Sequence, residues 1–433
     1  MRKQITIALT GLCLASAAAA QTAPVVSKFD VAGIPVIFKP VRANDVVAVR
    51  LYLRGGSANL SAGTAGIESL MLNSATGGTR KYNKDAFNAL ATSTGTAIGA
   101  DVSVDYSVLT LQAVRQHWNE AWDLFTEASL RPTFPAPEVE IVRGQLVDAA
   151  KRRADDPDTY LNFLADSMLY AGHPYSMLPT GTAASLTGIT RESLVTWHRE
   201  RMAKENLLIV VVGNATRADV ESKIRASFGT LPAKGRTAGT LARLGAITPE
   251  LYVVKRDLPT NYITGFFGAP TLSDPDYVAF RVATDVLGNR LFEEVRTKRN
   301  MTYAVAAGLE SRMANRGRLY VTAVEPDTTL KVIFSEVKRL QNEPVPRERL
   351  AETANASLTN YLMRQQTNMG QAAALGLWEL VGGGWQNYDR FVRGYRRVTP
   401  ADVQRVAKKY MTKARFAVIG DPAKVSRALV IGF

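Results

Sequence analysis

Apolar residues recur with the period of a β-strand in some segments of this chain and with the period of a helix in others. The same order of strand-like and helix-like segments occurs twice. Near the start, apolar residues dominate or alternate over Ser27–Val41 and Asp45–Arg54, which predicts β-strands. Past the middle, Leu251–Arg256 and Tyr262–Phe267 repeat this strand pattern. Segments with helical spacing of apolar residues, and further strands, follow in each half. Each half is therefore expected to combine helices and strands in an α+β or α/β sandwich.

The two halves also match in the order of their later elements. Ile189–Asn214 and Val398–Asp421 each contain a Thr that can cap a helix, an amphipathic helix, a short basic turn, an apolar strand and a Gly. Further upstream, the strand Tyr106–Val114 corresponds to the strand Leu319–Val324. The repeating unit of roughly 200 residues is too long for a solenoid repeat. The pattern therefore predicts an internal duplication.

The fold class that follows is α+β, with two homologous mixed α/β sandwich domains related by internal duplication. Residues 231–249 join the two halves and are rich in small residues, Gly and Pro, so they are predicted to be a linker. We expect one domain over residues 21–230 and another over residues 250–433. The composition, with 46% hydrophobic and 21% charged residues, is typical of a globular protein.

Residues 1–20 have the pattern of a secretory signal peptide. Arg2 and Lys3 precede an apolar core, and the small residues Ala18–Ala20 form a cleavage site. The apolar run is too short to span a bilayer, so no transmembrane segment is expected. Cleavage would remove Cys13, the only cysteine, and the mature protein would then need no disulfide in an oxidising compartment.

The positive charge of the chain does not indicate a nucleic-acid partner. Loss of residues 1–20 would lower the formal net charge from +14 to +12. The densest basic cluster, Lys151–Arg153, is followed at once by Asp155 and Asp156, whereas a nucleic-acid surface needs one concentrated basic patch. We therefore expect no nucleic-acid partner. The charge could still attract acidic peptides or the negative face of a membrane.

The segment Gly66–Thr79, GIESLMLNSATGGT, has one apolar stripe at helical spacing. Its flanks resemble the signature helix of the pitrilysin/insulinase family of zinc peptidases, the inverzincins, whose motif is His-x-x-Glu-His. In that family a Gly opens the helix three residues before the first His, and a Gly-Thr closes it. On this alignment, the family's first His, Glu and second His correspond to Ser69, Leu72 and Asn73.

These three replacements remove the chemistry of the motif. Two His at i and i+4 hold one zinc from the same helix face, and the Glu deprotonates the zinc-bound water. A serine hydroxyl and an amide are poor zinc ligands, and Leu72 cannot accept a proton. A register shifted by one turn places Glu68 on the catalytic Glu but Ala65 and Ser69 on the two His. Neither register supplies the ligands, so no metal is expected in this chain. From this segment alone, an ordinary core helix with chance flanks remains the alternative.

Two further segments resemble the family. In Glu138–Asp156, the family's third zinc ligand corresponds to Asp148. Asp148 alone cannot make a zinc site. It is expected to be a solvated or hydrogen-bonded carboxylate that faces the chamber between the two halves of the family's fold. Gly95–Tyr106 is similar to the strand that bounds the family's substrate cleft, with Gly99 and Ala100 where the family prefers Asn-Ala. The resemblance implies that extended peptides bind here by adding to a sheet edge.

Asn289–Ala304, NRLFEEVRTKRNMTYA, is close to a segment of the family's second domain that carries an Arg and a Tyr. Arg296 and Tyr303 match these positions, although Asn300–Thr302 replaces the usual Gly-Leu-Ala. The resemblance implies that the Arg orients substrate carbonyls and that the Tyr hydroxyl binds the oxyanion at the scissile carbonyl. The alternative is that Arg296 pairs with Glu293 on an exposed face and that Tyr303 opens a core strand.

The combined features are typical of the zinc-free subunit in two-chain members of this family, such as the mitochondrial processing peptidase. The resemblance implies two similar halves facing across a chamber, a homologous partner that carries zinc and an intact His-x-x-Glu-His, and peptide substrates. With the signal peptide, it also implies a bacterial periplasm. Arg296 and Tyr303 would act in the partner's active site.

Two other interpretations remain open at this point. One is a catalytically inert peptide-binding or assembly protein of the same fold, as in the family's respiratory-complex core subunits. The other, a hydrolase that works alone, would need a nucleophile–base pair, and the sequence offers none.

Overall fold

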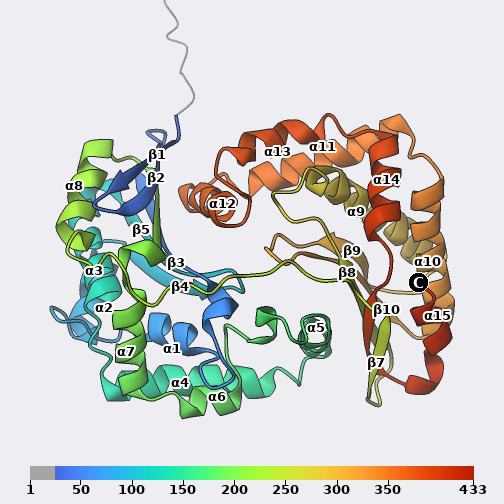
Figure 1. Ribbon diagram of the computed structural model, residues 1–433, viewed down its shortest axis with the longest axis horizontal. Coiled ribbons are helices and arrows are strands. Elements are labelled where there is room, and N and C mark those ends of the chain that lie inside the picture. The colour runs from blue at the N-terminus through green and yellow to red at the C-terminus, as the bar shows by residue number, and fades with distance from the viewer. Residues whose placement is uncertain (1–24) are drawn as a thin grey trace, which may run out of the picture.

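The computed structural model describes residues 25–433, whose strands form two separate mixed sheets (Figure 1). The first sheet has six strands in the order β1-β2-β6-β3-β5-β4. Within it, β2 and β6 run parallel and the other neighbours are antiparallel. Its strands are β1 (Ser27–Val31), β2 (Ile34–Pro40), β3 (Val46–Arg54), β4 (Ala97–Val102), β5 (Tyr106–Val114) and β6 (Leu207–Gly213).

The second sheet has five strands in the order β7-β11-β8-β10-β9. The pair β7–β11 is parallel and the other neighbours are antiparallel. This repeats the order β2-β6-β3-β5-β4 of the first sheet with the same relative directions. The α+β class with two mixed sheets is therefore confirmed, and the common topology supports the predicted duplication. The strands are β7 (Glu250–Lys255), β8 (Asn261–Gly268), β9 (Val305–Leu309), β10 (Arg316–Ala323) and β11 (Arg415–Gly420).

Helices pack around both sheets (Figure 1). In the first half they are α1 (Ile67–Ser74), α2 (Lys84–Ser93), α3 (Trp118–Leu130), α4 (Ala136–Arg152), α5 (Pro157–Leu169), α6 (Ala183–Gly188), α7 (Arg191–Arg201) and α8 (Arg217–Phe228). In the second half they are α9 (Tyr277–Leu291), α10 (Pro326–Asn342), α11 (Arg347–Met363), α12 (Asn368–Leu380), α13 (Asn387–Tyr395), α14 (Pro400–Tyr410) and α15 (Arg427–Ile431).

The helices α7 and α14 occupy equivalent places before the strands β6 and β11. As predicted, a threonine caps each helix: Thr190 accepts a hydrogen bond from the amide of Ser193, and Thr399 accepts one from the amide of Asp402. Such caps satisfy a backbone donor that the first helical turn leaves free. A threonine cap thus begins the equivalent helix in each half.

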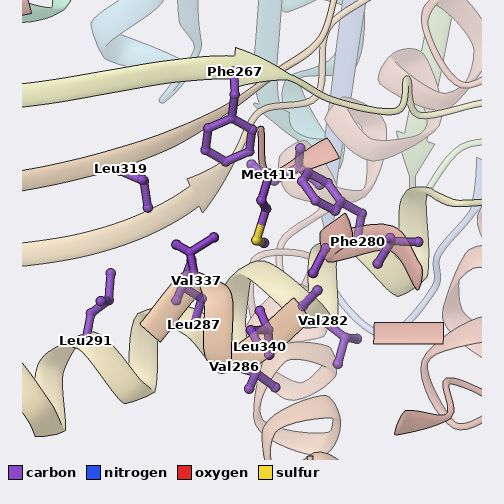
Figure 2. Close-up of a cluster of buried hydrophobic side chains, with 14 of the residues drawn as sticks. Phe267, Phe280, Val282, Val286, Leu287, Leu291, Leu319, Val337, Leu340 and Met411 are labelled. Atoms are coloured by element: carbon purple, nitrogen blue, oxygen red, sulfur yellow. The ribbon is translucent and has the colours of Figure 1, made fainter. Parts of the chain in front are cut away.

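The main core of the second half lies between its sheet and the helices α9, α10 and α14 (Figure 2). Phe267 and Leu319 project from the sheet, Phe280 and Leu287 come from α9, and Met411 follows α14. All of these side chains are buried. The first half has a corresponding core between its own sheet and helices.

The opposite face of each sheet is covered by a helix from the other half. On the first sheet, Tyr52 and Val210 form a cluster with Ala372 and Leu375 of α12. On the second sheet, Phe266 forms a cluster that includes residues of α5. Figure 1 shows α12 beside the strands of the first sheet and α5 beside those of the second. Because β6 is buried on both faces by this arrangement, it reads as the uninterrupted apolar run LLIVVV.

The predicted linker, residues 231–249, contains neither helix nor strand. It is nevertheless tied to the first half: the amide of Gly239 donates to Asn59 Oδ1 at 3.0 Å, and the amide of Lys204 donates to the carbonyl of Pro232 at 3.0 Å. Within the segment, Leu241, Leu244 and Ile247 pack against the cluster that contains α5. Residues 231–249, which we call the strap, are therefore held in place by contacts with the first half and with the cluster around α5. The exact domain limits remain a prediction.

The predicted signal peptide, residues 1–20, lies outside the described residues. Among residues 25–433, no helix combines the length and the apolar character needed to cross a bilayer.

Candidate functional site

The degenerate motif lies on the short helix α1, which starts directly after Gly66. Gly66 has φ = 88°, a conformation that side chains with a Cβ rarely adopt. A Cβ at this position would lie only 2.8 Å from the Cα of Gly181, so the two backbones approach too closely for any other residue. The glycine that opens the motif is thus required by this local packing.

The residues at the motif positions do not fit a zinc ion. Ser69 and Leu72 are buried, and Leu72 belongs to the apolar core of the first half. Asn73 is exposed, but its amide nitrogen donates to the carbonyl of Ser69 at 2.8 Å. Asp148 is an exposed residue of α4. Across residues 25–433, no three His, Cys, Asp or Glu side chains are grouped closely enough to hold a metal ion.

Glu68, the other candidate on α1, is a buried residue with several partners. Its Oε2 accepts a hydrogen bond from the hydroxyl of Ser107 on β5. Its Oε1 accepts from Trp197 Nε1 at 3.3 Å and from Asn59 Nδ2 at 3.4 Å. The same oxygen lies 3.6 Å from Nε of Arg201, whose side chain is fully buried. The carboxylate therefore joins α1 to β5, α7 and the segment before α1.

The guanidinium of Arg201 extends this network to the strap. It donates to the carbonyl of Arg236 at 2.7 Å and to the carbonyl of Arg54. Burial raises the pKa of the Glu68 carboxyl, while Arg201 and the hydrogen bonds oppose this shift. A carboxylate with this many partners in the core has no access to a substrate. The structure therefore gives no support to the shifted register, in which Glu68 would be the catalytic base.

Gly99 and Ala100 lie on β4, the edge strand of the first sheet. The exposure of residues along β4 alternates, and Gly99 is one of its exposed positions. On one side β4 pairs with β5, and on its other side no strand of residues 25–433 is paired with it. Such an edge is the geometry that strand addition by a peptide requires.

Arg296 and Tyr303 lie side by side, although no continuous helix joins them. α9 continues into the π-helical segment η5 (Phe292–Thr297), which carries Arg296. The chain then turns through Asn300, which has φ = 50°. The Arg296 guanidinium carbon is 4.9 Å from the centroid of the Tyr303 ring and 4.8 Å from that of Phe292. Both rings are thus close enough to attract the cation by cation–π interaction.

The structure differs from the alternative interpretation of this pair. Glu293 forms ion pairs with Lys298 at 3.1 Å and with Arg349 at 3.9 Å, and no ion pair with Arg296 is present in the described part of the chain. Tyr303 is 83% exposed, so it does not open a core strand. We call Phe292, Arg296 and Tyr303 the aromatic–arginine stack.

Two of the chain's three histidines, His173 and His198, have structural roles. The Nε2 atom of His173 lies 2.9 Å from the carbonyl of Ala242, and that of His198 lies 2.8 Å from the carbonyl of Ser129. Burial lowers the pKa of His198, and the hydrogen bond with Ser129 opposes this shift. Neither histidine is hydrogen-bonded to a nucleophilic side chain in the described residues.

We expect the purified chain to carry no stoichiometric zinc, because its motif positions hold one apolar side chain and two poor ligands. Elemental analysis by mass spectrometry after dialysis against zinc checks this, with an intact His-x-x-Glu-His homologue as the positive control. Stoichiometric zinc that disappears in Asp148→Ala would contradict the expectation.

Two family profiles match this chain. Residues 36–172 match the insulinase family of peptidases (peptidase family M16), and residues 188–357 match the inactive domain of peptidase M16. An uncharacterized zinc protease of Mycobacterium tuberculosis is 27% identical over 326 residues, which cover 71% of this chain and 73% of the relative. The non-peptidase homolog YmxG of Helicobacter pylori is 23% identical over 316 residues, which cover 70% and 71%.

Solved structures share the fold over nearly the whole chain. The crystal structure of a peptidase M16 inactive domain from Pseudomonas fluorescens has a TM-score of 0.82 and 22% identity, and the match covers 91% of this chain and 98% of that one. A chain of Complex III2 from Candida albicans has a TM-score of 0.79 and 15% identity, with 94% and 99% covered.

Proposed function

Because this chain belongs to the insulinase (M16) peptidase family, we propose that it is the zinc-free subunit of a two-chain metallopeptidase that degrades peptides. Its partner is a homologue with an intact His-x-x-Glu-His and a bound zinc, and the two chains enclose the peptide in a chamber. The signal-like residues 1–20 support a periplasmic location.

The aromatic–arginine stack is the observation that carries this proposal. The Tyr303 side chain is exposed, and in the described residues its hydroxyl makes no hydrogen bond, so it is free to donate one to another molecule. Phe292 and Tyr303 restrict the position of the Arg296 guanidinium without neutralising its charge. In the partner's active site, Arg296 orients a substrate carbonyl and Tyr303 stabilises the oxyanion.

The edge strand β4 supports the substrate class. Gly99 and Ala100 lie on this edge, and an extended peptide that pairs with it would form main-chain hydrogen bonds regardless of its sequence. Main-chain recognition of this kind suits an enzyme that degrades peptides of many sequences.

We expect peptidase activity only when this chain is mixed with the zinc-bearing homologue from the same source. Each chain is purified alone, and a quenched fluorescent peptide is then incubated with either chain and with the mixture. Sedimentation shows whether a complex forms. If neither a complex nor a gain in activity appears with any such homologue, the subunit role is refuted.

A second candidate is a peptide-binding or assembly protein without catalysis. The similarity to a non-peptidase homolog and to a chain of Complex III2 favours this function. A complex that forms but whose activity does not depend on the aromatic–arginine stack would support it.

A further inference from the structure

A cavity of about 580 Å³ lies between the helices α9, α11 and α12 of the second half, and Tyr106 of the first half also lines it. In Figure 1, α9 and α11 lie side by side, and α12 lies nearer the first sheet. The cavity is separate from the degenerate motif on α1. It includes Asn289, which precedes Arg296 by seven residues on the continuous helical segment formed by α9 and η5. A peptide that reaches Arg296 could therefore also reach this cavity.

Two cations in the cavity wall form no close ion pair with a carboxylate in the described part of the chain. Arg281 and Arg364 both line the cavity, and neither has an ion pair within 4 Å among the described residues. Arg281 makes one hydrogen bond, from Nη2 to the hydroxyl of Tyr277 at 3.3 Å. Its other guanidinium N–H groups have no acceptor in that part of the chain. A guanidinium placed in this way is ready to bind a planar anion.

The third charged residue of the wall is Asp285, whose carboxylate interacts electrostatically with Arg281 and Arg364. Asp285 Oδ2 accepts a hydrogen bond from the hydroxyl of Ser357 at 2.6 Å. Burial raises the pKa of this carboxyl, while Arg281, the bond from Ser357 and Arg364 oppose this shift. With two cations and one carboxyl, the wall suits a ligand that carries a single negative charge.

Part of the remaining wall is aromatic, beside small and polar residues such as Asn360. Trp378 and Phe391 have ring centroids 5.0 Å apart, and Tyr361 lies 4.8 Å from Phe391. The indole Nε1 of Trp378 donates to the hydroxyl of Tyr361 at 2.8 Å, which fixes both rings. Preformed aromatic walls with a few polar groups are typical of ligand pockets. They favour an apolar or aromatic side chain next to the anion.

From these features we infer that the cavity binds the C-terminal carboxylate of a peptide together with its last, apolar or aromatic side chain. Arg281 and Arg364 hold the carboxylate, and the rings around Trp378 contact the side chain. The inference rests on the proposed function in that it takes peptides as the ligands. It assigns to this chain a site that selects one end of the peptide.

Calorimetric titration of the full chain alone tests the inference. The probes are N-acetyl-Ala-Ala-Phe with a free carboxylate and the same tripeptide as its C-terminal amide. We expect the acid to bind and the amide to bind about tenfold more weakly or worse, because the amide loses the charge-assisted bonds. Arg281→Gln should bind the acid as weakly as the amide. Arg393→Gln, an exposed position of α13 outside the cavity, is the matched control and should bind as the unchanged chain does.

If Arg281→Gln fails to fold in a thermal melt, Ala373→Phe provides an independent variant. Ala373 lines the cavity from α12, so the larger ring would fill it and abolish binding. Equal binding of acid and amide, full binding by Arg281→Gln or Ala373→Phe, or no binding of the acid would overturn the inference. No partner or metal is present, so failure here is distinct from failure of the reconstitution experiment, and the subunit role could still stand.

Discussion

Replacing Arg201 by methionine should destabilise the chain by about 3–5 kcal/mol, the usual loss when one partner of a buried ion pair is removed. Arg201 is fully buried, and its Nε lies 3.6 Å from Oε1 of Glu68. Methionine fills a similar volume but leaves the carboxylate of Glu68 without a counterion. It also leaves the carbonyls of Arg54 and Arg236 without this donor. Urea unfolding followed by circular dichroism measures the change.

The effect of Arg201→Met should depend on pH. Burial already raises the pKa of Glu68 in the folded chain, and loss of Arg201 would raise it further. A carboxyl with a raised folded-state pKa stabilises the fold while it is protonated, below its unfolded pKa of about 4.3, and this stability is lost as pH rises through the folded value. The destabilisation should therefore be smaller in mildly acidic buffer than at neutral pH.

Arg217→Met is the matched control for this prediction. Arg217 forms an exposed ion pair with Glu221 at 2.6 Å, and such pairs contribute about 0–1 kcal/mol. Similar losses in the two variants, or a loss in Arg201→Met that is the same at both pH values, would show that Glu68 does not depend on Arg201.

The sequence was sufficient to predict the duplicated plan because the plan depends on local signals. Strand and helix periods, together with caps such as Thr190 and Thr399, act over a few residues and recur in both halves. The covering of each sheet by a helix from the other half was not predicted. It depends on contacts such as Tyr52 with Leu375, which are far apart in the chain and carry no local signal.

The same distinction holds for the candidate site. Gly66, aligned with the glycine that opens the family's signature helix, located the altered motif. The close contact of its backbone with that of Gly181 requires a glycine at this position. The role of Glu68 was missed, since its partners Ser107 and Arg201 come from remote elements. The resemblance placed Arg296 and Tyr303 together in one site. The structure brings them together through the turn at Asn300, with Phe292 as a third member that the resemblance did not indicate.

In a complex reconstituted with the zinc-bearing homologue, Tyr303→Phe should lower kcat about 10²–10³-fold, the effect of losing one oxyanion donor, or some 2.7–4 kcal/mol. The substitution removes only the hydroxyl and keeps the ring on which Arg296 stacks. Because Tyr303 is 83% exposed, the thermal stability and the assembly of the subunits should hardly change. Steady-state kinetics beside a thermal melt and sedimentation measure all three.

Arg296→Ala separates substrate binding from transition-state stabilisation. It should raise KM as well as lower kcat, because Arg296 would contact the substrate carbonyl before the transition state forms. Tyr252→Phe, which removes a hydroxyl from another partly exposed tyrosine on β7, is the control and should leave both constants unchanged. If Tyr303→Phe is as active as the unchanged complex, the hydroxyl takes no part in the chemistry. The aromatic–arginine stack would then be a binding surface, and the non-catalytic function would be the one that fits the chain.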